Sequence, residues 1–239
     1  MKIFIVNGSP RGTKGYTNKL IELFAEGARK AGADVTIEQL AHKNIHHCTG
    51  ELACWTKTPG ECIHKDDMGD MLKKMTSSDG IVFASPVYVD GMTGLLKNFL
   101  DRCVPTVQPF FELRDGHIRH PSRHGRAQRV ALISGCGFSE MDNFDPLVNH
   151  IKAVCKNMNA AYSGAVLYPA MPAMDAMRFI HPLKFRKIKA AICSAGEQFV
   201  KASSIDEGTA KVISQPLIST DKYVEVANKQ FQKKLDELD

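Results

Sequence analysis

Short apolar runs alternate with amphipathic stretches along the first 170 residues, and this alternation constrains the fold more than any other feature. Strands are expected at 2–6, 35–40, 80–84, 129–134 and 162–167. Between the first two, Leu20, Leu23, Phe24 and Ala28 recur at the spacing of one helical face. Strand–helix–strand repeats form a parallel sheet with helices on both faces. We therefore predict a doubly wound α/β domain.

Three turns follow the first, third and fourth expected strands, and each has an unusual composition. They begin at Asn7, Ser85 and Gly135. In doubly wound sheets, ligands bind at the carboxyl ends of the strands, near the point where the strand order reverses. We expect these three turns to meet at one binding site.

The turn after the first strand, 7–18, is a candidate anion site. It opens a helix, whose first amides and dipole favour a negative charge. Ser9, Thr13 and Thr17 add hydroxyl groups, and Arg11 adds a fixed positive charge. The spacing matches neither the Walker motif nor the dinucleotide fingerprint. We predict phosphate binding, and the alternative is a plain Gly/Pro turn.

The turn after the third strand, 85–94, suits a different part of a ligand. Tyr88 lies beside backbone amides just after Pro86 and Val87. An aromatic face next to free amides matches a flat ring system with polar edges.

Taken together, these motifs resemble the flavodoxin-like NAD(P)H-dependent FMN reductases, including the iron–sulfur flavoproteins. The matching residues are GSPR at 8–11 with Thr17-Asn18, DDM at 66–68, SPVY at 85–88 and GLLKNFLDR at 94–102. The resemblance covers roughly residues 1–170. It implies a flavodoxin-like three-layer sandwich, with a five-stranded parallel sheet in the order 2-1-3-4-5. It also implies an FMN-dependent oxidoreductase that passes reducing equivalents from NAD(P)H through bound FMN to an acceptor.

The resemblance also implies which residues hold the cofactor. The FMN phosphate would be held by Ser9, Arg11, Thr17 and Asn18. The isoalloxazine ring would be lined by Pro86, Val87 and Tyr88, and a third contact loop would be formed by Ser134, Gly135, Cys136 and Gly137. We interpret Cys136 as a small residue beside the ring, with a reactive thiol as the alternative. No catalytic side chain is assigned, and a homodimer or homotetramer is expected.

The loop with Cys48, Cys54 and Cys62 departs from the family's cluster-bearing members. Those members have a C-x2-C-x2-C run followed by a fourth cysteine, whereas Glu51 stands at the second position here. Three thiolates remain for a cluster that takes four. We expect reduced cysteines that shape the flavin pocket or an interface, rather than an iron–sulfur cluster. A cluster with a glutamate ligand and a zinc site with a neighbouring histidine are the alternatives.

A long segment without periodicity, 104–126, is rich in basic residues. One hypothesis assigns NAD(P)H phosphate binding to its arginines, because a guanidinium matches phosphate geometry. The alternative is a solvated loop. These residues are Arg114, Arg119, Arg123 and Arg126.

The charge and apolar content of the chain make some classes of protein less suitable as an interpretation. The chain has 239 residues and a formal net charge of +5, which is modest and does not by itself indicate nucleic-acid binding. No apolar run is long enough to span a membrane, and the N-terminus lacks a secretory pattern, so we expect a cytoplasmic protein. A non-enzymatic flavodoxin-like electron carrier is the main alternative, although such carriers tend to be acidic. A regulatory nucleic-acid-binding module is a further alternative.

Two regions are expected. Residues 1–170 form the flavodoxin-like FMN-binding domain. Residues 171–239 read mostly as helices, which we expect to pack on the same domain or on a partner subunit.

Overall fold

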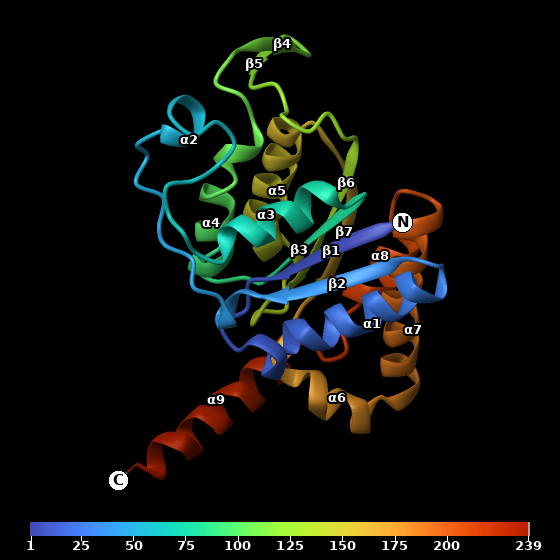
Figure 1. The fold of residues 1–239 in the computed structure, drawn as a ribbon. Coiled ribbons are helices and arrows are strands. Elements are labelled where there is room, and N and C mark those ends of the chain that lie inside the picture. Colours follow the sequence, from blue (N-terminus) through green and yellow to red (C-terminus); the bar gives the residue numbers. More distant parts are fainter. Residues whose placement is uncertain (239) are drawn as a thin grey trace.

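The computed structural model describes residues 1–238, and a five-stranded parallel sheet forms its centre (Figure 1). The strands lie side by side in the order β2-β1-β3-β6-β7. In chain order this is 2-1-3-4-5, so the predicted topology is confirmed. Their bounds are β1 (Lys2–Asn7), β2 (Asp34–Gln39), β3 (Gly80–Pro86), β6 (Gln128–Gly135) and β7 (Ala160–Tyr168).

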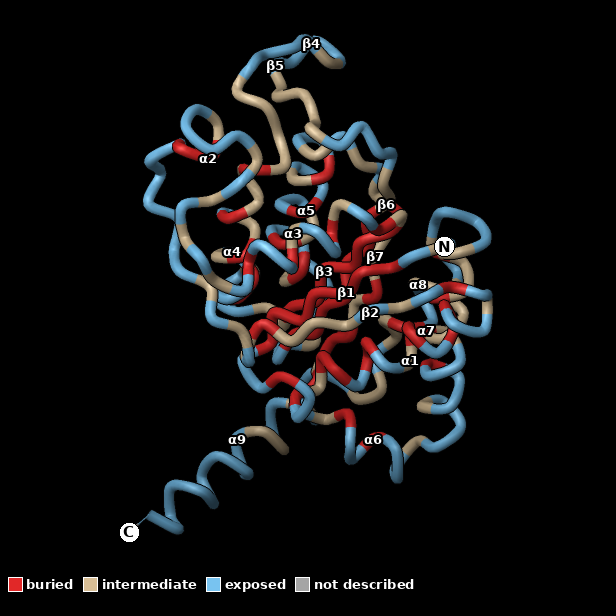
Figure 2. Tube along the Cα trace, viewed as in Figure 1, coloured by how far each residue is buried: buried red, intermediate tan, exposed pale blue. Residues whose placement is uncertain are grey.

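Helices cover both faces of the sheet and enclose two separate cores. Successive residues of β1 alternate between them: Ile3 and Ile5 face one core, and Phe4 and Val6 face the other. Buried residues are concentrated in the strands and on the inner sides of the helices (Figure 2). The first core contains α1 (Tyr16–Lys30), α7 (Pro182–Lys201) and α8 (Glu207–Ser214); the second contains α3 (Met68–Ser77), α4 (Gly94–Asp101) and α5 (Asp145–Met158).

Helices α1 and α7 cross at unusually close range because each has a glycine at the contact. A Cβ atom on Gly27 would lie 1.7 Å from the Cys193 carbonyl oxygen. A Cβ atom on Gly196 would lie 2.0 Å from the Phe24 carbonyl oxygen. Both contacts are with backbone atoms, so α7 packs directly against α1 in the same helical layer.

The segment 104–126 is more ordered than the sequence reading suggested. It contains a two-stranded antiparallel hairpin of β4 (Glu112–Arg114) and β5 (His117–Arg119), which stands away from the central sheet (Figure 1). Asp115 and Gly116 form its turn, with φ angles of 52° and 75°. Asp-Gly is a strong two-residue hairpin signal, which the absence of longer periodicity obscured.

The remaining elements are short, apart from the last helix. They are η1 (Gly12–Lys14), η2 (Leu40–His42), α2 (Ala53–Thr56), η3 (Val104–Thr106), η4 (Met141–Phe144), η5 (Met171–Ala173), α6 (Met174–Ile180) and α9 (Thr220–Asp236). None of the described side chains of α9 is buried, and the helix projects from the rest of the molecule (Figures 1 and 2). Among residues 1–238, no helix has the length and apolar character of a membrane span.

Candidate functional site

The three turns identified from the sequence line a single cavity at the carboxyl ends of the strands. Its volume is about 940 Å³, within the usual range for small-molecule sites. Nine of the predicted residues contribute to its wall: Ser9, Arg11, Thr17, Pro86, Val87, Tyr88, Gly135, Cys136 and Gly137. The expected convergence is therefore observed.

The turn after β1 is held in shape by side chains that point inward. The Asn7 Oδ1 atom accepts from the Ser9 amide at 2.9 Å, and the Asn7 Nδ2 atom donates to Gln39 Oε1 at 2.7 Å. The Arg11 amide donates to Ser9 Oγ at 3.3 Å. Gly12 has a φ of +51°, a conformation that a side chain disfavours. This turn is fixed by contacts within the chain.

The start of α1 faces the same turn. Gly15 precedes the helix in an extended conformation and has no side chain to cap it. The amides of Tyr16 and Thr17 belong to the first turn, where a helix supplies no acceptor. A Cβ atom on Gly15 would lie 2.8 Å from Ser9 Oγ, so only glycine leaves this space open. The result is a cradle of amides and hydroxyls suited to an anion.

Two predicted residues lie behind the cavity wall. Asn18 is buried, and its Oδ1 atom accepts from Gln39 Nε2 at 2.9 Å. Ser134 is fully buried, and its hydroxyl donates to the Ser85 carbonyl oxygen at 2.7 Å. Both side chains brace residues of the site rather than line it.

A buried threonine joins the first and third turns, and sequence reasoning missed it. The Thr93 hydroxyl donates to the Gly8 carbonyl oxygen at 2.6 Å and accepts from the Leu96 amide at 3.3 Å, which caps α4. The Thr93 amide donates to Ser85 Oγ at 3.0 Å. Threonine directly before an apolar helical pattern is an N-cap signal, so the sequence did contain a clue.

The turn after β3 has an unusual backbone. Tyr88 and Gly91 exchange two backbone hydrogen bonds, at 3.0 and 3.1 Å. Between them, Val89 and Asp90 have φ angles of 47° and 59°. A β-branched residue at positive φ is strained, and such strain is concentrated at functional sites. The turn leaves Tyr88 half-exposed on the cavity wall and Val89 almost completely exposed.

The turn after β6 is anchored by backbone hydrogen bonds to the end of β7 and the start of η5. The Cys136 amide donates to the Tyr168 carbonyl oxygen at 3.1 Å, and its own carbonyl accepts from the Met171 amide at 2.9 Å. The Phe138 amide donates to Cys136 Sγ at 3.3 Å. Burial raises the pKa of the Cys136 thiol, which keeps it protonated. The structure thus favours a packing role over a reactive thiol.

The outer wall of the cavity comes from α6 and α9, to which sequence reasoning gave no function. The Tyr223 hydroxyl donates to the Gly137 carbonyl oxygen at 2.6 Å and ties α9 to the third turn. Much of this wall is apolar, including Met177, Ile180, Val226 and Phe231. The cavity therefore has a polar end at α1 and an apolar outer part.

A model of the family described as NADPH-dependent FMN reductase matches residues 1–165. The chain belongs to this family. The match spans the whole sheet apart from the end of β7, and it includes all three turns of the cavity.

Similar proteins include two named iron–sulfur flavoproteins. One, from Archaeoglobus fulgidus, is 39% identical over 102 residues, which cover 43% of this chain and 48% of that protein. Another, from Methanocaldococcus jannaschii, is 37% identical over 105 residues, which cover 43% and 50%. The chain thus matches about half the length of these relatives.

Solved structures share the fold at low identity. An FMN-dependent NADH-azoreductase from Bacillus anthracis, in complex with FMN, has a TM-score of 0.62 at 15% identity, covering 84% of this chain and 99% of that one. An NAD(P)H:quinone oxidoreductase from Methanothermobacter marburgensis has a TM-score of 0.61 at 15% identity, covering 83% and 96%. These similarities support the flavodoxin-like fold of the FMN reductase family.

The residues present fit FMN, the cofactor of the FMN reductase family. The amides at the start of α1, Ser9 and Arg11 provide partners for a phosphate. The space that Gly15 leaves free lies directly at these groups. Tyr88 and the turn at Gly135 line the same cavity further out, where a ring would lie.

Two motifs of the FMN reductase resemblance meet outside the cavity. Asp66 and Arg102, from DDM and LKNFLDR, form a buried ion pair with an N–O distance of 2.8 Å. Arg102 also donates to the His46 carbonyl oxygen at 2.6 Å. Burial opposes ionisation of Asp66, but hydrogen bonds from Arg102 and from the backbone hold its pKa below its usual range. These motif residues anchor the cysteine loop to α4.

The cysteine loop does not assemble a ligand set for the cluster named in the relatives. Cys48 is exposed, Cys54 is buried and Cys62 is half-buried. Within residues 1–238, no three His, Cys, Asp or Glu side chains are grouped as a metal site. The loop supplies three thiols and a glutamate, whereas a cubane cluster takes four thiolates. The residues present therefore do not fit the cluster.

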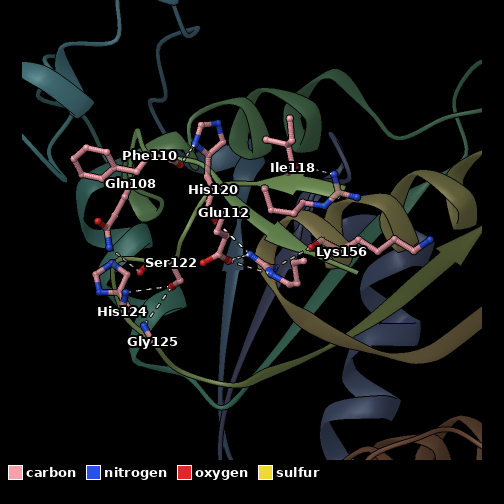
Figure 3. A network of polar contacts seen from close by, with 11 residues as sticks. Gln108, Phe110, Glu112, Ile118, His120, Ser122, His124, Gly125 and Lys156 are labelled. Carbon is pink, nitrogen blue, oxygen red and sulfur yellow. Dashed lines mark hydrogen bonds and ion pairs between the residues drawn. The ribbon is translucent and has the colours of Figure 1, made fainter. Parts of the chain in front are cut away.

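Two of the arginines of 104–126, Arg114 and Arg126, pair with nearby carboxylates. Arg114 pairs with Glu112 at 2.5 Å and donates to the Lys156 carbonyl oxygen, as Figure 3 shows around the labelled Glu112 and Lys156. Arg126 pairs with Asp79 at 3.5 Å. Among the described residues that line the cavity, none comes from this segment. The structure therefore gives no support to their proposed role in NAD(P)H binding.

Proposed function

We propose that this chain is an FMN-dependent oxidoreductase that takes reducing equivalents from NAD(P)H and passes them to an acceptor bound in the same cavity. One observation carries the proposal. A single cavity joins an anion cradle at the start of α1 to an apolar outer wall on α6 and α9. This arrangement matches a phosphorylated ring cofactor with space above it for a second molecule.

The phosphate end is assigned to Ser9, Arg11 and Thr17, with the amides of Tyr16 and Thr17. Charge-assisted hydrogen bonds from a guanidinium and from helix amides are the strong ones in phosphate binding. Asn18 is assigned a supporting role, because its side chain braces the turn through Gln39.

The ring is assigned to the turns at 86–88 and 135–137, with Tyr88 placing its edge or face. When bound, FMN supplies the capacity to accept and donate hydride and electrons. The amides of Val87, Tyr88 and Cys136 already donate within the chain, to Gly135, Gly91 and Tyr168. The protein's contribution here is placement of the ring beside an open space.

The nicotinamide nucleotide is assigned to the outer part of the cavity. Lys222 and Lys234 line it and offer positive charge to a diphosphate. We thus assign to these two lysines the NAD(P)H phosphate binding that was first hypothesised for the arginines of 104–126. The apolar residues between them favour an organic acceptor, which would occupy the space after the nucleotide leaves. Dependence on NAD(P)H is consistent with the proposed cytoplasmic location.

Flavin bleaching tests this proposal directly. Protein loaded with FMN should lose its oxidised flavin absorbance when mixed anaerobically with NADH or NADPH in a stopped-flow instrument. Bleaching by one nucleotide also identifies the donor. A chain that binds FMN but is bleached by neither would instead be an electron carrier. A chain that takes up no FMN would refute the assignment altogether.

We also propose that residues 171–239 complete the site within a homo-oligomer. Val224, Phe231 and Leu235 on α9 are 50%, 65% and 58% exposed. Phe179 and Leu183 form a second exposed apolar surface at α6 and the start of α7. Large exposed apolar surfaces mark sites of association. Sedimentation should show a dimer or tetramer, and changing Phe231 and Leu235 together to Gln should shift it toward monomer.

A further inference from the structure

The cysteine loop has the spacing of a cluster site with one position changed. Cys48, Glu51, Cys54 and Cys62 follow the pattern of two residues, two residues and seven residues between successive positions. Relatives that share more than a third of the aligned residues are named iron–sulfur flavoproteins. A cluster of this kind is held by four cysteine thiolates. Only position 51 departs from that set.

The surroundings of the loop contain buried donors without partners. Among residues 1–238, five buried side-chain nitrogen or oxygen atoms lack a hydrogen bond, and four of them belong to His64, Arg102 and Arg123. His64 stacks on His46 with ring centroids 5.2 Å apart. The Cδ atom of Arg123 lies 3.5 Å from where a Cβ on Gly60 would be. These side chains therefore lie along the loop.

Unpartnered buried donors are costly, and an anion beside them would offset that cost. Arg102 is almost completely buried, and its Nε atom is one of the four. An iron–sulfur cluster held by thiolates is anionic, and its sulfur atoms accept hydrogen bonds. The loop thus keeps an environment suited to a cluster, although its ligand set is incomplete.

Glu51 is engaged in a different, local interaction. Its Oε2 atom accepts from the Thr49 hydroxyl at 2.6 Å. The next residue, Leu52, has a φ of 57° and precedes α2. Glu51 is exposed and lies at the point where the chain turns into α2. Carboxylate is also a harder ligand than the thiolate that iron–sulfur clusters select.

We infer that the loop is a former cluster site that cannot bind a cluster because Glu51 replaces one of the four cysteine ligands. The wild-type chain retains no cluster, and a cysteine at position 51 restores cluster binding. This inference concerns the loop alone and does not depend on the proposed oxidoreductase activity. If the inference about the loop and the proposed oxidoreductase activity are both correct, reducing equivalents leave through the cavity and not through the cysteine loop.

Anaerobic reconstitution tests the inference with three proteins: wild type, Glu51→Cys and Glu51→Ser. Each is treated with sulfide and equal amounts of ferrous and ferric iron, which together have the oxidation level of [4Fe–4S]²⁺. Each cysteine releases its proton to the buffer as its Sγ–Fe bond forms. Iron and sulfide per chain are measured after chelation and desalting, and FMN uptake reports whether each variant is folded.

The expected result is about four irons and four sulfides per chain in Glu51→Cys, with the wild type and Glu51→Ser below one. The Glu51→Cys protein should also give an electron paramagnetic resonance signal after reduction with dithionite. Because position 51 is exposed, FMN uptake should be equal in all three proteins. A stoichiometric cluster in the wild type would overturn the inference. So would a Glu51→Cys protein that takes up FMN normally but no more iron than Glu51→Ser.

Discussion

Replacing Thr93 by valine tests whether buried hydroxyls hold the candidate phosphate turn in shape. The Thr93 hydroxyl bonds to the Gly8 carbonyl oxygen at 2.6 Å and caps α4 at the Leu96 amide. Valine keeps the branched shape and removes both bonds. Loss of the cap costs about 1 kcal/mol. A buried carbonyl without its partner costs about 1–3 kcal/mol more. We expect the free energy of unfolding to fall by about 2–4 kcal/mol.

Urea denaturation of the FMN-free protein measures this change. The midpoint should move to lower urea with an unchanged slope, because the surface exposed on unfolding stays the same. Thr93→Ser is the matched control, since it keeps the hydroxyl and loses one methyl group, at a cost of about 1 kcal/mol. FMN affinity should fall further in Thr93→Val than in Thr93→Ser, because Gly8 belongs to the candidate phosphate turn. Equal stability of the two variants would show that the hydroxyl does not hold the turn.

Three further predictions address the cofactor, the nucleotide and the buried ion pair. Arg11→Ala should weaken FMN binding by about 10-fold or more in equilibrium titration. Lys14→Ala, which removes a charge beside the cavity wall, should change it little. Lys234→Ala should raise the KM for NAD(P)H and leave FMN content unchanged; an unchanged KM would exclude this lysine from the nucleotide site. Asp66→Asn should destabilise the protein by about 3 kcal/mol, because it leaves the buried Arg102 charge without its partner. Since the Asp66 pKa is lowered in the fold, its contribution is present above the ordinary carboxyl pKa of about 4 and is lost as pH falls through the lowered value. Acid titration monitored by circular dichroism should therefore show a smaller loss of stability in Asp66→Asn than in wild type.

The sheet and its ligand-binding edge could be predicted because their signals are local. Each inner strand is a short apolar run that ends at a Gly, Ser or Pro turn, and a parallel sheet brings those turns to one edge. The spacing of Met68, Met71 and Met75 is a local helical signal of the same kind, and all three side chains are buried in the second core. A pattern that repeats every few residues is sufficient to predict such features from the sequence.

Other features depend on distant contacts that no local pattern contains. Asn18 is the last residue of the turn at 7–18, yet its side chain bonds to Gln39 on the next strand and does not line the cavity. Asp66 and Arg102 belong to motifs that carried the family resemblance without an assigned role, and they meet as a buried ion pair. The hairpin at 112–119 was missed for a different reason, because its strands are three residues long and show no period.

The inner wall of the cavity comes from the turns after β1, β3 and β6, and the outer wall comes from α6 and α9. This difference in origin bears on how acceptor choice can vary within the FMN reductase family. The family match ends at residue 165, so it includes the phosphate and ring turns and excludes α6 and α9. Yet Met177, Val226 and Phe231 supply the surface that a second molecule would contact. Under the proposed assignment, cofactor binding depends on the first part and the outer wall on the second, so the acceptor could change without loss of the flavin site. Phe231→Ala should therefore alter the KM for NAD(P)H and the KM for an organic acceptor together, because both are assigned to the outer wall, while FMN affinity stays unchanged. A loss of FMN affinity would show instead that α9 shapes the ring site itself.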